Sequence, residues 1–350
     1  MASRIPVAVL GATGAVGQRF VQLLAGHPVF EITALAASQR SAGKSYADAC
    51  RWVIPGDPPP SVSKMVVSPL KPNIEAHLIF SALPADVARD VEPQFARAGY
   101  AVCSNASAFR YEPDVPLVIP EVNADHLSLI AGQRAGRGWP GFIVTNPNCS
   151  TTGIVLALKP LHDAFGLSKV FAFTMQGASG AGYPGVPSLD ILGNVIPYIG
   201  GEEEKIACET RLLLGDVDEK EQHEAKISVS AHANRVPVTD GHTIALSLGF
   251  EHRPTPEEAL EVLRAFRGPT DVHALPSAPV QPIVVRDEND RPQPRRDRDA
   301  ERGMAVSVGR VRECPILDLR LVVVVHNTIR GAAGGSLLNG ELLVKRGFVK

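Results

Sequence analysis

The sequence predicts an α/β fold in two parts: a doubly wound parallel sheet, then a second domain with a mixed or antiparallel sheet. Through the first 150 or so residues, short apolar segments alternate with amphipathic segments of helical length, which is typical of parallel strands joined by helices. From about residue 165 the apolar segments are longer and show β-branched alternation, as in antiparallel strands. A length of 350 residues also suits two domains.

The same pattern predicts each element in turn. In the first domain we expect strands over 6–10, 30–37, 76–83, 101–104 and 142–146, and helices over 16–25 and 85–98. In the second we expect helices over 154–161 and 256–267, and strands over 169–176, 226–232, 243–250 and 317–325. A last helix is expected over 331–344. The segment 286–302 holds six arginines and six acids, and its zero net charge predicts a solvated loop.

The composition excludes several classes of protein. The formal net charge is −2, which argues against a protein that coats nucleic acid or an anionic membrane. The five cysteines are too far apart for a paired-cysteine metal site or a disulfide framework, and no metal is expected. The N-terminal residues lead into a strand without a signal-like segment, and the longest aliphatic run, 321–325, is far short of a ~20-residue membrane span. We therefore expect a cytoplasmic protein with free thiols.

A glycine-rich motif, Gly11-Ala-Thr-Gly14-Ala-Val-Gly17, lies between the first strand and the first helix. Glycines there allow the backbone to approach a pyrophosphate, which binds at the helix N-terminus. A tight turn without a ligand would need similar glycines, but the position in the chain favours a Rossmann-type dinucleotide-binding domain. The residues expected to contact the cofactor are Gly11, Thr13, Gly14, Ala15, Val16 and Gly17, with Ser81 in the third strand.

The end of the second strand indicates which dinucleotide binds. NAD-binding proteins usually carry Asp or Glu there, for the ribose 2′-hydroxyl. This chain has Ser38, Arg40 and Ser41 instead, which suit a 2′-phosphate that a carboxylate would repel. A polar loop without a ligand is the alternative, and NADP(H) is the cofactor that we favour.

Of the five cysteines, Cys149 is the one whose neighbouring residues indicate a reactive thiol. It follows a predicted strand within Asn146-Pro-Asn-Cys-Ser150 and precedes the apolar helix, so we expect it at a helix N-terminus. Backbone N–H groups and the helix dipole would stabilise a thiolate there, and the same N–H groups could bind an oxyanion. Ser150 and Thr151 could simply cap the helix, which is the structural alternative. Among ten histidines, His242 is singled out because Arg235 precedes it across a turn, although a surface histidine would give the same pattern.

Over nearly its whole length the chain resembles the aspartate-β-semialdehyde dehydrogenase family, because it carries a series of that family's motifs in the same order. The resemblance is to the archaeal and fungal branch in particular. The matching segments are 11–17, 104–107 with Arg110, 118–123, 146–150, Gln176 with 179–184, 201–205, 235–238 with 241–242, 291–295, and Asn327 with 331–333. The resemblance implies reduction of L-β-aspartyl phosphate by NADPH, giving L-aspartate 4-semialdehyde for lysine, threonine, methionine and isoleucine synthesis. It implies a thioester on Cys149, acid–base catalysis by His242, which suits an ordinary pKa of about 6.5, and orientation of the substrate by Gln176.

The resemblance also implies how the substrate and cofactor are held. Arg235 would bind the α-carboxylate bidentately, and Glu202 the ammonium. Arg110 and Lys205 would bind the phosphate, and Asn327 the nicotinamide carboxamide. The run of three glutamates at 202–204 leaves the register open, and Glu202 is preferred because it stands one helical turn before Lys205.

The resemblance implies an NADP-binding domain over 1–148, completed by a helix over 330–350. Residues 149–329 would form the α/β catalytic and dimerisation domain of a homodimer or homotetramer. Two alternatives stay open. One is a malonyl-CoA reductase or N-acetyl-glutamyl-phosphate reductase on the same scaffold, for which Glu202 would have no ammonium to bind. The other is a non-catalytic NADP sensor, which would not need Cys149, Gln176, Arg235 and His242 together.

Overall fold

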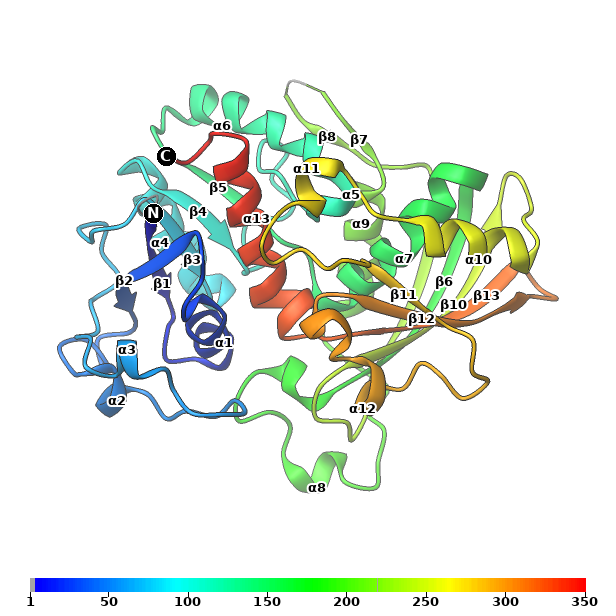
Figure 1. Cartoon of the computed structure of the whole chain (residues 1–350), viewed down its shortest axis with the longest axis horizontal. Helices are drawn as coiled ribbons and strands as arrows, with labels where there is room; N and C mark the ends of the chain where they lie inside the picture. The colour runs from blue at the N-terminus through cyan, green and yellow to red at the C-terminus, as the bar shows by residue number, and fades with distance from the viewer. Residues whose placement is uncertain (1–3, 219) are drawn as a thin grey trace.

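The computed structural model describes residues 4–218 and 220–350, so residues 1–3 of the expected first domain lie outside the described residues (Figure 1). The first sheet is parallel throughout, with strand order β2-β1-β3-β4-β5. Its strands are β1 (Ile5–Leu10), β2 (Phe30–Ala36), β3 (Leu78–Ser81), β4 (Ala101–Ser104) and β5 (Phe142–Thr145). Every strand expected in this part of the chain is present, although β3 is shorter than the apolar segment 76–83.

Helices cover both faces of the first sheet. Alternate residues of β1 point to opposite faces, so that Val7 and Val9 enter one core and Ala8 and Leu10 the other. The first core contains residues of α1 (Ala15–Leu24), α6 (Leu129–Arg137) and α13 (Gly334–Lys345), and the second contains residues of α4 (Ala85–Arg97). The last helix of the chain thus packs beside the first one, and Figure 1 shows α13 against this sheet. The domain boundary at residue 148 stays a prediction.

The second sheet is mixed, with strand order β11-β12-β13-β10-β6-β9. In that order the strands are β11 (Ile283–Arg286), β12 (Val306–Glu313), β13 (Leu319–Val325), β10 (His242–Phe250), β6 (Leu167–Gln176) and β9 (Ser228–Arg235). β6 is parallel to β9 and antiparallel to β10. A two-stranded ribbon, β7 (Asp216–Val217) with β8 (Gln222–His223), lies apart from it.

Helices cover one face of the second sheet. Residues of α7 (Cys149–Phe165), α9 (Glu202–Leu213) and α10 (Pro256–Ala265) form a core with inward residues of the strands. Gly153 lets α7 lie directly on β13, because a Cβ at this position would come within 2.7 Å of Val325. On the opposite face Phe171 and Phe173 of β6 are each 39% exposed. This open face is therefore available for another contact.

The remaining helical segments are short. They are α2 (Tyr46–Ala49), α3 (Pro60–Ser63), α5 (Pro120–Asn123), α8 (Ser188–Ile191), α11 (Thr270–His273), α12 (Pro294–Asp297), the 3₁₀ turns η1 (Ala124–Ser128), η2 (Ala178–Ala181) and η3 (Ala300–Gly303), and the π-helical turn η4 (Ile329–Ala333). Because η4 precedes α13, that helix begins three residues later than expected. Among the described residues, none of the helices combines the length and the apolar character needed to cross a membrane.

The prediction of a solvated loop over 286–302 holds for residues 287–290 and 295–296, which are exposed, but was wrong for the charged residues that pair in the interior. Arg291 and Asp297 in this segment are buried, and Arg291 Nε donates to Asp297 at 2.7 Å. Arg286 Nε lies 2.9 Å from the same carboxylate. Net charge does not reveal this outcome, because opposite charges that pair with one another can be buried together.

Candidate active site

Cys149 is the first residue of α7, directly after β5 and a short turn. The cap of this helix is Asn148, whose side-chain oxygen accepts hydrogen bonds from the Ser150 and Thr151 amides. The sequence suggested the hydroxyls of Ser150 and Thr151 as caps, but neither hydroxyl caps α7. Both amides donate to Asn148, and the Ser150 amide also lies close enough to the Cys149 sulfur to lower the pKa of the thiol.

Three predicted residues meet at one edge of the second sheet because of its strand order. β6 and β9 run parallel and end in register at Gln176 and Arg235, while the antiparallel β10 begins at His242. The ends of β6 and β9 and the start of β10 therefore share the edge next to Cys149. Cys149 Sγ lies 3.2 Å from His242 Nε2.

His242 is fully buried, so the surface histidine considered from the sequence is excluded. Its Nδ1 accepts a hydrogen bond from the Gly177 amide at 3.1 Å. This contact assigns the neutral ring its hydrogen on Nε2, which therefore points at the sulfur. Burial lowers the pKa of His242 to about 3, and the charge of Arg235 contributes to the decrease. The expectation of an ordinary histidine pKa is wrong for His242.

Cys149 is half-buried as a residue. Burial of its thiol, together with the neighbouring Glu202 carboxylate, raises the pKa to about 12. The positive charges of Arg110 and Arg235 oppose this rise but do not cancel it. The expected stabilised thiolate is therefore not found, because desolvation and a nearby carboxylate outweigh the helix N-terminus.

This shift predicts the pH dependence of alkylation at Cys149. Only the thiolate reacts with iodoacetamide, and a raised pKa keeps the thiol protonated at neutral pH. The rate should therefore be low at pH 7 and still rise about tenfold between pH 9 and pH 10, whereas that of an ordinary thiol, with a pKa of about 8.5, levels off above about pH 9.5. Mass spectrometry of the Cys149 peptide separates its reaction from that of the other cysteines. A rate that levels off below about pH 9.5 would contradict the raised pKa.

Glu202 lies next to these residues, at the first position of α9. It is buried, and Oε1 accepts from Gln176 Nε2 at 2.9 Å and from Asn148 Nδ2 at 2.8 Å. Glu203 instead accepts from the Ala233 amide, and Glu204 is exposed. Of the three glutamates, only Glu202 faces the cysteine-bearing turn.

Arg110 and Lys205 differ in their surroundings. Arg110 is buried and forms an ion pair with Glu209 of α9, at 3.0 Å. Lys205 is half-buried, and no ion pair is found for it among residues 4–218 and 220–350. The sequence reasoning missed Glu209 and Asn148. The spacing of Glu209, two helical turns after Glu202, would have placed it on the same face of α9.

Asn327 lies just beyond β13, at the same end of the sheet. Its side-chain oxygen accepts from the Gly241 amide at 2.8 Å, and its Nδ2 donates to Ser179 Oγ at 2.8 Å. Asn327 therefore connects the turn before His242 with the segment after Gln176.

The glycine-rich turn forms where β1, β2 and β3 end. Gly11 has φ +74°, and a Cβ there would come within 2.7 Å of the Ala82 carbonyl oxygen. A Cβ on Gly17 would come within 2.1 Å of the Gly11 carbonyl oxygen, so glycine is required for α1 to pack this closely. Gly14 is exposed at the N-cap of α1 and leaves the helix N-terminus open to a ligand. Thr13 in the turn and Ala15 and Val16 at the start of α1, which are also expected at this site, are half-buried.

The other predicted cofactor residues lie at the same edge of the first sheet. Ser38 and Arg40 are exposed in the turn after β2, and Ser41 is half-buried, with its amide bonded to the Ser38 carbonyl. Ser81 ends β3 and is buried. Its hydroxyl lies close enough to the buried Glu92 carboxylate to lower the pKa of that group.

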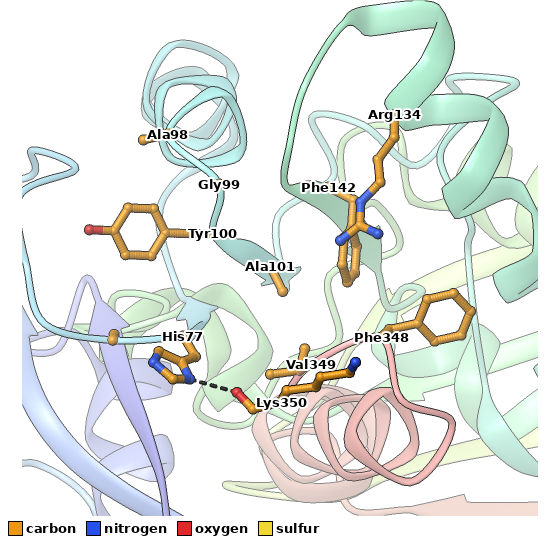
Figure 2. Close-up of a pocket in the computed structure, with 11 residues that line it drawn as sticks. His77, Ala98, Gly99, Tyr100, Ala101, Arg134, Phe142, Phe348, Val349 and Lys350 are labelled. Carbon is orange, nitrogen blue, oxygen red and sulfur yellow. Dashed lines mark hydrogen bonds between the residues drawn. The ribbon is translucent and has the colours of Figure 1, made fainter.

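Two cavities lie away from these residues. One, of about 310 Å³, is lined by the starts of β4 and β5, Arg134 and the C-terminal residues (Figure 2). The other, of about 320 Å³, lies beside the end of α1. Ligands of parallel α/β sheets bind at the carboxyl ends of the strands, whereas the first cavity is at the amino ends. Neither cavity contains a predicted site residue.

Comparisons with known proteins agree with the resemblance. The family model described as "Semialdehyde dehydrogenase, NAD binding domain" matches residues 6–130, and "Semialdehyde dehydrogenase, dimerisation domain" matches residues 158–330. The aspartate-semialdehyde dehydrogenase of Methanothermobacter thermautotrophicus is 55% identical over 343 residues, 97% of this chain and 99% of that protein. The protein of the same name from Saccharomyces cerevisiae is 46% identical, over the full length of both. A crystal structure of aspartate semialdehyde dehydrogenase with NADP from Candida albicans has a TM-score of 0.91 at 46% identity, covering 98% of this chain and 99% of that one.

Proposed function

The chain belongs to the aspartate-semialdehyde dehydrogenase family, and from that premise we propose that it reduces L-β-aspartyl phosphate to L-aspartate 4-semialdehyde with NADPH. The observation that supports this most directly is the 3.2 Å contact of Cys149 Sγ with His242 Nε2, at a helix N-terminus between buried groups of both charges. The high identity to archaeal and fungal relatives confirms the expected branch.

Cys149 is the nucleophile in this proposal. Its thiolate attacks the acyl carbon, the bond from that carbon to the phosphate oxygen breaks, and inorganic phosphate leaves a thioester. Bound NADPH supplies the hydride that reduces this thioester. The Nε2–H of His242 donates a hydrogen bond to the oxyanion that hydride addition produces, and as the carbonyl re-forms, the carbon–sulfur bond breaks and returns the thiolate. Cys149 is a thiol at neutral pH and the neutral His242 ring already carries a hydrogen on Nε2, so the thiol proton passes to solvent before the thiolate attacks.

The charged groups around Cys149 suit the three charged ends of the substrate. We assign Arg235 to the α-carboxylate and Glu202 to the ammonium. Arg110, with Lys205, is assigned to the phosphate. Gln176 donates to Glu202 at 2.9 Å, so it orients the group that binds the ammonium as well as the substrate itself.

NADP(H) fits the edge of the first sheet. The exposed Gly14 and the open N-terminus of α1 leave room for the pyrophosphate. No carboxylate follows β2, and the exposed Arg40 would pair with the 2′-phosphate, with Ser38 and Ser41 beside it. The buried hydroxyl of Ser81 is a further hydrogen-bonding group at this edge. Asn327 is assigned to the nicotinamide carboxamide.

Replacement of Arg40 by alanine tests the choice of dinucleotide. Loss of one charged contact to the 2′-phosphate should raise KM for NADP about tenfold and leave KM for NAD unchanged. Lys44→Ala, which removes an exposed charge from the same loop, is the control and should change neither constant. An equal change for both dinucleotides would contradict the assignment.

We propose that the protein is a homodimer or homotetramer, paired through the open face of the second sheet. The matched dimerisation-domain model spans this sheet, and Phe171 and Phe173 give the face an apolar centre. Its expected partners are otherwise small molecules and not nucleic acid or membranes.

The decisive assay follows NADPH absorbance in purified protein supplied with aspartate semialdehyde, phosphate and NADP. We expect NADPH to form only when phosphate is present. Activity on malonyl-CoA instead would favour the sister reductase, whose substrate would not need the buried Glu202. NADP binding without turnover of any acyl substrate would favour the sensor. The comparisons favour neither alternative.

A further inference from the structure

Helix α9 carries two buried glutamates on one face. Glu202 and Glu209 are seven residues apart, which is about two helical turns. Glu202 is already assigned to the substrate ammonium, whereas Glu209 has no part in the proposed chemistry. A buried carboxylate is unfavourable unless opposite charge and hydrogen bonds compensate it, so the donors around Glu209 indicate what it does.

Three donors surround Glu209, and they come from two different segments of the chain. Its Oε1 accepts from Arg110 Nη1 at 3.0 Å and from the Tyr111 hydroxyl at 3.2 Å. Its Oε2 accepts from the backbone amide of Asn148 at 2.6 Å. One carboxylate therefore connects the arginine assigned to the phosphate with the residue that caps α7 and precedes Cys149.

The contact with Glu209 fixes the orientation of the Arg110 guanidinium. Arg110 Nη2 donates to the Asn105 carbonyl at 3.0 Å, so the group is held from two sides. A guanidinium has five N–H donors, and these contacts use two of them. The buried Arg110 Nε has no hydrogen-bond partner among the described residues. The Arg110 charge also acts on Cys149, where it lowers the pKa of the thiol, so the guanidinium is near the reacting sulfur.

We propose that Glu209 is a positioning residue for phosphate binding, which orients Arg110 through one carboxylate oxygen and holds Asn148 through the other. This inference rests on the proposed function, because it takes Arg110 as the group that binds phosphate. A carboxylate is needed because both of its oxygens accept. Glutamine has the same shape but a single acceptor, so in either orientation its NH₂ group faces Arg110 or the Asn148 amide, each of which is a donor.

The test is the kinetics of Glu209→Gln in the phosphate-dependent oxidation of aspartate semialdehyde. We expect KM for inorganic phosphate to rise about tenfold, the scale of one charged hydrogen bond. KM for the semialdehyde and for NADP should stay within about twofold of the wild-type values. A purely structural role for Glu209 would loosen the whole site and change the three constants together.

Two control variants isolate the contact with Arg110. Glu204→Gln makes the same chemical change on the same helix, but at an exposed position. Tyr111→Phe removes the other donor to Oε1 and leaves the ion pair with Arg110. Both should keep KM for phosphate within about twofold. Glu209→Asp keeps the charge but moves it back by one methylene. The increase in KM should therefore be smaller than for Glu209→Gln, and KM should still rise for phosphate alone.

An unchanged KM for phosphate in Glu209→Gln, or an equal increase for all three substrates, would overturn the inference. If Glu209→Gln does not fold, the same comparison is made with Glu209→Asp, and there too a change without selectivity for phosphate overturns it. The wild-type protein is assayed first. Absence of phosphate-dependent NADPH formation in the wild type would refute the proposed function itself, which distinguishes the two failures.

Discussion

Replacement of Cys149 by alanine is expected to reduce phosphate-dependent NADPH formation by about 10⁴-fold or more, because no other nucleophile is assigned to attack the acyl carbon. Affinity for NADP should stay nearly unchanged, since the proposed cofactor residues belong mainly to the first sheet. The measurement is steady-state turnover together with fluorescence titration of NADP.

Cys149→Ser should be almost as inactive as Cys149→Ala, because a serine hydroxyl is a much weaker nucleophile without a strong base beside it. Its neighbour His242 has a pKa lowered to about 3, which makes it a poor proton acceptor in the free site. Cys208→Ala is the matched control, since Cys208 is partly exposed within α9 and contacts Glu224. Turnover within tenfold of the wild-type rate in Cys149→Ala would remove Cys149 as the nucleophile.

The second large effect is expected on stability, from a fully buried ion pair between Glu121 and Arg330. Arg330 Nη1 and Nη2 donate to the two carboxylate oxygens at 2.8 and 2.5 Å, and both side chains are about 1% exposed. Arg330→Met would leave Glu121 buried and without a charge partner. Loss of one partner of a buried pair costs about 3–5 kcal/mol, so a clear fall in Tm is expected.

The same change should also lower turnover, because the chain next to Arg330 packs against the nucleophile. A Cβ on Gly331 would lie 2.6 Å from Cys149 Cβ, so any shift of this segment disturbs Cys149. The double variant Glu121→Leu with Arg330→Met removes both charges and should recover most of the lost stability. Arg4→Met breaks an exposed ion pair with Glu31 and should change Tm little. An equal Tm for Arg330→Met and the wild type would contradict this prediction.

Local pattern was sufficient to predict the first sheet and the position of Cys149 at a helix start. Consecutive parallel strands are separated by helices, so each strand is followed by a turn. Turn-forming residues such as Gly11 and Asn148 make these turns recognisable in the sequence. Pattern was less informative in the segment 286–302. There Arg291 and Asp297 pair in the interior, and nothing in the net charge distinguishes paired from solvated ions.

The sequence by itself determined the α/β class, the glycine turn, the NADP-like end of the second strand and the family, because these depend on short motifs and their order. Only the tertiary structure decided how the site is assembled and charged. Gln176, Arg235 and His242 meet because β6 lies between β9 and β10, an order that their sequence spacing does not specify. The pKa shifts of Cys149 and His242, and the contacts of Glu209, depend on burial among residues distant in sequence. Desolvation and pairing are properties of the packed interior, so they could not be predicted from the motifs alone.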